Sequence, residues 1–337
     1  MTRYTTTYAK SIALFSLAFC LSQSAFSLDA QGRAYSQRDD VQTFIADIAK
    51  KDDFPQAWLT LLFDQAEFKP AVIKAILPPV NPAIKSWQTY RGRFVEPKRI
   101  AAGLAFWNQY ADVVKRASDQ YGVPEEIIVA IIGVETIYGR NMGNFETFSA
   151  LTTLAFDYPP RADLFRQQLE ELLLLARDEG RNPRDYTGSF AGALGLPQFL
   201  PGSIRKYAVD FDGNGDVDVA TPIDAIGSVA NFLAQHGWVK GGPIIASAQI
   251  SDADAAPLIA LGLKPQLMPK NMTGVISPNA PQEDAALIDL VTPGQPTEYR
   301  LGYQNFYVIS RYNRSSFYAT AVCDLARALK EKHEVRL

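Results

Sequence analysis

The sequence predicts an α+β protein that is mainly helical, with a small β-containing segment before the last helix. Two observations lead to this prediction. Apolar residues recur at intervals of three and four along much of the chain, which is the spacing of one face of a helix. Residues 239–300 instead contain prolines, glycines and short apolar runs, which are typical of strands and turns. The 337 residues, 47% of them apolar, are long enough for a large core and for one large domain or a few small ones.

The first 27 residues are expected to be a signal peptide. Arg3 and Lys10 supply positive charge ahead of a short apolar run over 11–20, which is too short to anchor the chain across a bilayer. Residues 25–27 read Ala-Phe-Ser, with small residues on both sides of a variable one, as at a cleavage site. We therefore expect a mature chain that begins at Leu28 and is soluble in the periplasm.

Two alternatives to this prediction stay open. The segment could instead be a buried N-terminal helix. Cys20 could carry a lipid anchor, although Phe19 argues against this because lipoprotein processing requires a small residue just before the cysteine.

The charge and cysteine content of the mature chain exclude some classes of protein. Removing residues 1–27 takes away two basic residues and no acidic ones, which leaves 31 basic and 36 acidic residues and a net charge of −5. This balance argues against nucleic acid as a partner. Only Cys323 remains, so no intramolecular disulfide can form. No later segment resembles a membrane span, and we expect a monomer.

Helix signals recur in order along the chain. Pro97 and Pro124 each stand where a proline can open a helix, and acidic residues follow Pro124 in the first turn, where the helix dipole favours them. The predicted helices are short ones within 37–77 (for example 41–49), then 97–120, a helix from 124 to about 138, 161–180, 221–235 and 315–331, with 80–96 predicted to be irregular.

Glu135 is a carboxylate in an apolar stripe. The inward positions of the helix that begins at Pro124 are Ile128, Ile131 and Ile132, and steps of three and four residues from these reach Glu135. Loss of hydration there would raise its pKa, which suits a general acid near neutral pH. The alternative is a structural carboxylate bonded to an arginine or to backbone amides.

Glu135 lies in the first of six segments that resemble the lytic murein transglycosylase B family. This segment is Gly-Val-Glu-Thr-Ile-Tyr-Gly at 133–139. The others follow in family order at 158–163, 188–199, 210–224, 224–232 and 311–315, so that the resemblance covers most of 87–325. It implies a lysozyme-like helical core formed by 121–238 and 301–337. An N-terminal helical region at 28–120 and a β-containing module at 239–300 complete the predicted domains.

The resemblance also implies a reaction, in which Glu135 acts as the single general acid and base. It would protonate the oxygen that links N-acetylmuramic acid to N-acetylglucosamine in peptidoglycan. It would then take a proton from the muramyl C6 hydroxyl, which closes a 1,6-anhydro ring without water. Ordinary glycosidases need a second carboxylate. Asp157 and Asp163 are available as partners, but no motif assigns either of them that role.

The family pattern implies further residues that hold the sugar. The segment at 188–199 is rich in glycine, which permits close approach of backbone to a ligand. Alternative roles are helix capping or packing for Ser189 and its neighbours, a surface location for Arg161, and core packing for the aromatic residues. The implied substrate-binding residues are Tyr90, Arg161, Ser189, Gln198, Tyr312, Asn313 and Tyr318.

Residues 210–218 alternate acids and amides with other residues and place Gly215 sixth, like the first half of an EF-hand loop. Position twelve is Thr221 instead of glutamate, and Asp224 at position fifteen could close the site. The alternative is a solvated turn in which Asp224 only caps the helix at Thr221. We predict a structural calcium ion, with ligands from Asp210, Asp212, Asn214, Asp216 (through its backbone carbonyl) and Asp224.

Two other functions remain possible from the sequence. One is a muramidase that admits water, and the other is a peptidoglycan-binding scaffold that has lost its activity. The intact set of Glu135, Ser189 and Gln198 argues against the scaffold. Peptidoglycan glycan strands are the expected partner, and proteins of the cell-wall synthesis machinery are further candidates.

Overall fold

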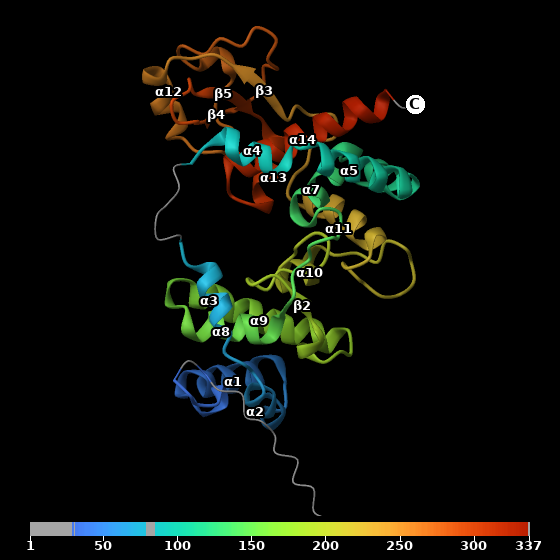
Figure 1. Cartoon of the computed structure of the whole chain (residues 1–337), viewed down its shortest axis with the longest axis vertical. Helices are drawn as coiled ribbons and strands as arrows, with labels where there is room; N and C mark the ends of the chain where they lie inside the picture. The colour runs from blue at the N-terminus through green and yellow to red at the C-terminus, as the bar shows by residue number, and fades with distance from the viewer. Residues whose placement is uncertain (1–28, 30, 79–84, 336–337) are drawn as a thin grey trace, which may run out of the picture.

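The computed structural model describes residues 29, 31–78 and 85–335 (Figure 1). These residues form fourteen α-helices, four 3-10 helices and five short strands. The prediction of an α+β fold that is mainly helical is therefore confirmed. The predicted signal peptide and Cys20 lie outside the described residues. Within the described residues, no helix combines the length and the apolar character that a membrane crossing requires.

The N-terminal helices form one group with two helices from the middle of the chain, in the lower half of Figure 1. Its members are α1 (Asp39–Asp52), α2 (Gln56–Asp64), α3 (Pro70–Ile76), α8 (Thr147–Asp157) and α9 (Ala162–Asp178). Contacts between aromatic rings hold this group together. Phe63 of α2 packs edge to face on Phe148 of α8, with ring centres 5.2 Å apart. Arg38 donates a hydrogen bond of 2.7 Å to Asp157, which ties the start of α1 to the end of α8.

A second group of helices surrounds α7 (Glu125–Thr136). The α7 helix is apolar on all sides because it is enclosed, and every residue from Ile127 to Val134 is buried. The helices around it are α5 (Pro97–Gln109), α6 (Ala111–Tyr121), α11 (Pro222–Gln235) and α14 (Ser316–Glu334). α4 (Trp87–Phe94) and α13 (Gln304–Tyr312) pack on α14, and α10 (Pro201–Tyr207) joins the two groups by contacting both α9 and α11.

The strands form two small antiparallel sheets. β3 (Ile245–Ala248) and β4 (Ala286–Leu290) flank β5 (Glu298–Gly302), and Leu301 of the central strand lies opposite both Ala246 and Leu287. α12 (Asp252–Ile259) packs on this sheet, which has a small apolar core of its own. β1 (Phe145–Glu146) pairs with β2 (Thr187–Gly188) beside the glycine-rich segment.

Several predicted helix boundaries were wrong. Residues 87–94, predicted to be irregular, form α4, which Ser86 caps by accepting a hydrogen bond from the Thr89 N–H. The single helix predicted over 97–120 is two helices, because Tyr110 leaves helical geometry (φ −115°, ψ 26°) and its ring packs on Phe106. Neither α8 nor α13 was predicted, and α12 is a short helix within the segment predicted to be β-containing.

The predicted domain boundaries stay predictions. The structure shows that α4 and α5, which both fall within 28–120, pack against α14 near the C-terminus. It also shows that the strands of the larger sheet fall within 245–302.

Candidate active site

Glu135 lies in the last turn of α7, at the end of the apolar stripe. The helix follows Pro124 and carries Glu125 and Glu126 in its first turn, as its dipole favours. Glu135 is only partly buried, whereas its neighbours Val134 and Thr136 are buried. The carboxyl group is thus held on an apolar helix at the point where the helix reaches the surface.

The surroundings of Glu135 make it a weaker acid than an ordinary glutamate. Loss of hydration raises the pKa of Glu135 from 4.5 to about 7, and a hydrogen bond from Tyr318 opposes that rise. No other carboxylate of the described chain contributes to this shift in pKa. Near neutral pH the group therefore exists in both protonation states, as a residue that donates and then accepts a proton requires.

Tyrosines surround the carboxyl group. The Tyr318 hydroxyl donates a hydrogen bond of 2.5 Å to Glu135 Oε1. Tyr312 stacks on Tyr318, with ring centres 6.4 Å apart, and donates its own hydroxyl to the carbonyl of Pro197 at 2.7 Å. The charge of Glu135 helps to raise the pKa of Tyr90 on α4, after the larger effect of burial. The fold thus brings residues from α4, α7, α13 and α14 to one place.

The glycine-rich segment folds back on itself through its own hydrogen bonds. The Ser189 N–H donates to the Ala193 carbonyl (2.8 Å), and the Ser189 hydroxyl accepts from the Ala193 N–H (3.0 Å). Gln198 has a left-handed backbone (φ 50°), and its side-chain amide donates to the carbonyls of Gly195 (2.9 Å) and Met142 (3.1 Å). These bonds hold Gln198 in one orientation and leave its side-chain oxygen available as an acceptor.

Other residues named from the sequence have different surroundings. Arg161 is exposed, with its guanidinium 5.4 Å from the ring centre of Phe165, and Asn313 is exposed at the end of α13. Asp157 accepts hydrogen bonds from Arg38 and from the hydroxyl of Tyr35, so it is held within the N-terminal group of helices.

The contact between Tyr318 and Glu135 was not predicted. The sequence suggested only a sugar contact for Tyr318, because 183 positions separate the two residues and no local spacing reports such a pair. Tyr318 is buried in the first turn of α14, after the capping residue Ser315.

The loop at 210–224 places three carboxylates together. One oxygen from each of Asp210, Asp212 and Asp224 lies within 4.8 Å of the others. Asp224 is fully buried and accepts hydrogen bonds from the N–H groups of Phe211 and Asp218, each 2.8 Å long. Hydrogen bonds from backbone amides hold the pKa of Asp210 below its ordinary value. Charged oxygen donors close together are the ligands that calcium prefers, so these residues fit the predicted ion.

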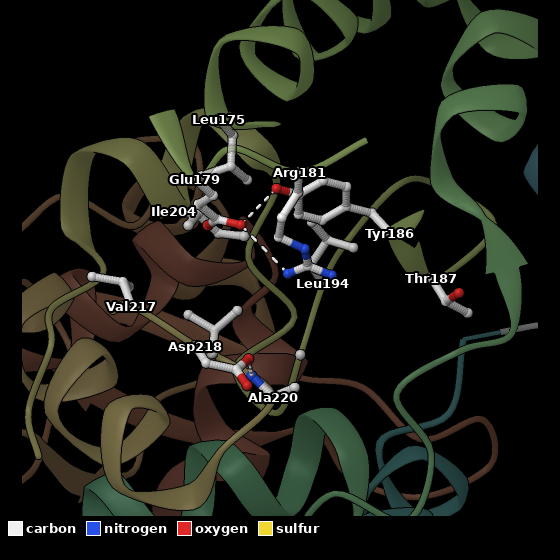
Figure 2. A pocket seen from close by; sticks show the side chains of 12 residues that line it. Leu175, Glu179, Arg181, Tyr186, Thr187, Leu194, Ile204, Val217, Asp218 and Ala220 are labelled. Carbon is white, nitrogen blue, oxygen red and sulfur yellow. Dashed lines mark hydrogen bonds and ion pairs between the residues drawn. The ribbon is translucent and has the colours of Figure 1, made fainter. Parts of the chain in front are cut away.

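A cavity of about 180 Å³ lies between this loop and the C-terminal end of α9 (Figure 2). Its polar side holds Glu179, which accepts from the hydroxyl of Tyr186 (2.5 Å) and pairs with Arg181 at 3.4 Å. Leu194 and Gly195 also line this cavity. Glu135 is not among the residues that line this cavity.

Comparison with known proteins gives matches over most of the chain. The sequence profile of the family described as "Transglycosylase SLT domain" matches residues 36–327. Membrane-bound lytic murein transglycosylase B of Escherichia coli is 40% identical over 311 residues, which are 88% of this chain and 84% of that protein.

Solved structures of lytic transglycosylases have the same fold. Lytic transglycosylase SltB1 of Pseudomonas aeruginosa is 43% identical (TM-score 0.83; 89% of this chain and 99% of that chain). Escherichia coli Slt35 in complex with calcium is 38% identical, with a TM-score of 0.80, and the match covers 91% of this chain and 96% of that chain. Pseudomonas aeruginosa SltB3 in complex with NAG-anhNAM-pentapeptide is 29% identical, with a TM-score of 0.75, and the match covers 89% of this chain and 80% of that chain. The resemblance found in the sequence is confirmed.

Proposed function

The chain belongs to the transglycosylase SLT domain family, whose members include lytic transglycosylases of peptidoglycan, and on this premise we propose the reaction and the residues that perform it. In this proposal the protein cleaves the β-1,4 bond between N-acetylmuramic acid and N-acetylglucosamine and forms 1,6-anhydromuramyl ends. Glu135 is the only acid and base. The observation that carries this proposal is the position of Glu135 at the end of the buried helix α7, where Tyr318 donates a hydrogen bond to it and where burial raises its pKa.

The proposed reaction uses each proton once. Protonated Glu135 gives its proton to the glycosidic oxygen as the bond from that oxygen to the muramyl C1 breaks. The resulting carboxylate then takes the proton of the muramyl C6 hydroxyl while this oxygen bonds to C1. Glu135 is thereby protonated again, and no water is consumed. A nucleophile tethered within the substrate gains the rate advantage of an intramolecular reaction, so a second carboxylate is not needed.

Two observations support this mechanism. No second carboxylate of the described chain influences the pKa of Glu135. SltB3, a structural neighbour, is known in complex with a fragment that contains anhydro-N-acetylmuramic acid.

The sugar-binding residues are part of the same proposal. We assign Tyr312, Tyr318 and Gln198 to sugar binding beside Glu135, because the rings of Tyr312 and Tyr318 stack there and the side-chain oxygen of Gln198 remains available as an acceptor. Ser189 binds the sugar through its free hydroxyl proton, since its oxygen already accepts from Ala193. Tyr90 joins these residues, since the charge of Glu135 acts on its hydroxyl. Asn313 and Arg161, which are both exposed, extend the binding surface to more distant parts of the substrate.

Analysis of products from purified murein tests the reaction. Mass spectrometry should find anhydromuramyl ends, which are 18 Da lighter than reducing ends because the product lacks one water. Reducing ends would instead identify a muramidase. An inactive wild-type protein that still sediments with murein would identify a binding scaffold.

We further expect an extracytoplasmic protein that acts on murein as a monomer. The relative in Escherichia coli is a membrane-bound murein transglycosylase. Periplasmic release after cleavage near Leu28, and contacts with the cell-wall synthesis machinery, remain proposals from the sequence.

Tyr318→Phe should move the pH dependence of turnover upward. The hydrogen bond from Tyr318 lowers the pKa of Glu135, so its loss should leave that pKa above about 7. The acid form then persists to higher pH, and the alkaline limb of kcat should shift in the same direction. The measurement is the pH profile of kcat on a soluble muropeptide. Tyr312→Phe is the control because its hydroxyl bonds Pro197 instead, and identical profiles for both variants would contradict this role of Tyr318.

Calcium should stabilise the protein through the loop at 210–224. An ion that binds only the folded state adds about 2.7 kcal/mol to the free energy of unfolding at a hundredfold excess over its Kd. Thermal melts with calcium and with chelator should therefore differ, and Asp210→Ala should remove the difference. Asp216→Ala should retain it, because Asp216 is proposed to bind through its backbone carbonyl. Equal melting temperatures of the wild type at saturating calcium and in chelator would argue against the site.

A further inference from the structure

Thr136 follows Glu135 in the sequence, and its buried hydroxyl joins two segments of the active site. The oxygen lies 3.2 Å from the Ile132 carbonyl of the same helix and 3.1 Å from the Leu196 carbonyl of the glycine-rich segment. It also accepts a hydrogen bond of 3.0 Å from the Gly139 N–H. The single hydroxyl proton is therefore shared by two carbonyls, while the oxygen serves one donor.

The turn beyond Thr136 has a backbone that needs such support. Ile137 and Tyr138 have φ angles of 55° and 58°, a left-handed conformation that side chains other than glycine rarely adopt. Conformations of this kind persist where surrounding contacts hold them, and they concentrate at functional sites. The hydrogen bond from Gly139 to Thr136 closes this turn directly after the catalytic carboxylate.

Leu196 is held from both sides. Its N–H donates to the Val219 carbonyl at 2.9 Å, and its carbonyl accepts from Thr136. In the described part of the chain, no other group donates to that carbonyl. The neighbouring Gly195 packs so tightly that an added Cβ would lie 2.3 Å from the Val219 oxygen. The segment that carries Gln198 is therefore anchored at Gly195 and Leu196, and the hydroxyl of Thr136 links this anchored segment to the end of α7.

We infer that Thr136 is a positioning residue that aligns the end of α7 with the turn at 195–198. Its hydroxyl fixes where Glu135 stands relative to Gln198 and to the sugar between them. This inference rests on the proposed role of Glu135. Misplacement of a catalytic group by about 1 Å can cost about 10²-fold in rate, so one hydrogen bond at this place can control turnover.

The test compares Thr136→Val with Thr136→Ser. Valine fills the same volume without the hydroxyl, and serine keeps the hydroxyl. We expect kcat on a soluble muropeptide to fall by about 10- to 100-fold in the valine variant, with KM changed by less than about threefold. Serine should restore kcat to within about threefold of the wild type. The pH profile of the valine variant should also shift upward, because a displaced Glu135 loses contact with Tyr318.

The matched control is Thr152→Val in α8. Thr152 is also fully buried, but its hydroxyl has no hydrogen-bond partner among the described residues, so its loss should leave kcat unchanged. If Thr136→Val does not fold, Thr136→Cys takes its place, since a thiol is similar in size but a weak donor, and a fall in kcat is again expected. A folded Thr136→Val or Thr136→Cys protein with wild-type kcat and pH profile, even at a lower melting temperature, overturns the inference.

Glu135→Gln in the same assay separates the two possible failures. If Glu135→Gln stays active, the proposed function itself fails. If Glu135→Gln is inactive while Thr136→Val is fully active, only the positioning role of Thr136 is wrong.

Discussion

Replacing Glu135 by glutamine should abolish turnover of murein and leave the fold intact. Positioned acids and bases typically contribute about 10²- to 10⁴-fold in rate. In the proposed reaction one group serves both proton transfers, so the loss should reach or exceed the upper end of that range. Glutamine keeps the shape of the side chain, and its amide oxygen can still accept the hydrogen bond from Tyr318. Murein binding should survive because the tyrosines and Gln198 remain.

The same variant should be more stable than the wild type in neutral solution. Burial raises the pKa of Glu135 to about 7, which means that the folded state disfavours the charged carboxylate. The unfolded chain loses its proton near pH 4.5, so the wild type loses stability as pH rises from there to about 7. Glutamine does not ionise. The gain in free energy of unfolding should therefore be absent below pH 4 and reach roughly 1–3 kcal/mol above pH 7.

Circular dichroism, urea melts at pH 4 and pH 7.5, and mass spectrometry of murein products check both effects. Asp163→Asn is the control, because Asp163 is fully exposed and its nearest partner, Arg166, is 3.6 Å away. A folded Glu135→Gln protein with more than a tenth of wild-type activity would contradict the assignment. The search for the acid would then return to Asp157, although Arg38 and Tyr35 already bind it.

The location of Glu135 was predictable because it depends on local periodicity. The apolar stripe of α7 has a period fixed by helix geometry, so a carboxylate that continues the stripe can be located by counting. The acids of the loop at 210–224 were predictable for a similar reason, since alternate residues of a turn point to one centre. Both features lie within about fifteen consecutive residues.

Features that depend on distant contacts were not predictable in this way. The hydrogen bond from Tyr318 to Glu135 exists because α14 returns across α7, and no spacing in either helix indicates it. The α4 helix was missed because three aromatic residues, Trp87, Tyr90 and Phe94, are its only apolar stripe, and its stability comes from packing on α14. α8 was missed because polar residues such as Ser149 are buried in it, where Ser149 accepts a hydrogen bond from the N–H of Glu67.

Replacing Asp324 by asparagine should destabilise the protein more than any surface substitution. Asp324 of α14 is buried and accepts hydrogen bonds from Arg300 of β5 (2.6 Å) and Arg91 of α4 (2.5 Å). Arg300 is itself largely buried, with 12% of its side chain exposed, and would keep as its counter-charge only Glu298, which lies 2.6 Å away and is more exposed. Removing one partner of a buried ion pair costs about 3–5 kcal/mol. Arg91 and Arg327 are more exposed and should add little.

The pH dependence of this loss distinguishes a charge effect from a packing effect. The arginines hold the pKa of Asp324 below its ordinary value, so the carboxylate stabilises the fold above about pH 4 and the contribution disappears as pH falls further. Urea melts should therefore show a wide gap between the wild type and Asp324→Asn at pH 7, and a narrower gap below pH 4. If the difference in stability between the two proteins were the same at pH 7 and below pH 4, the loss would come from packing rather than from charge. Asp324 joins β5 to α14, the helix that carries Tyr318. Folded Asp324→Asn protein should therefore keep its activity only if α14 still holds Tyr318 against Glu135.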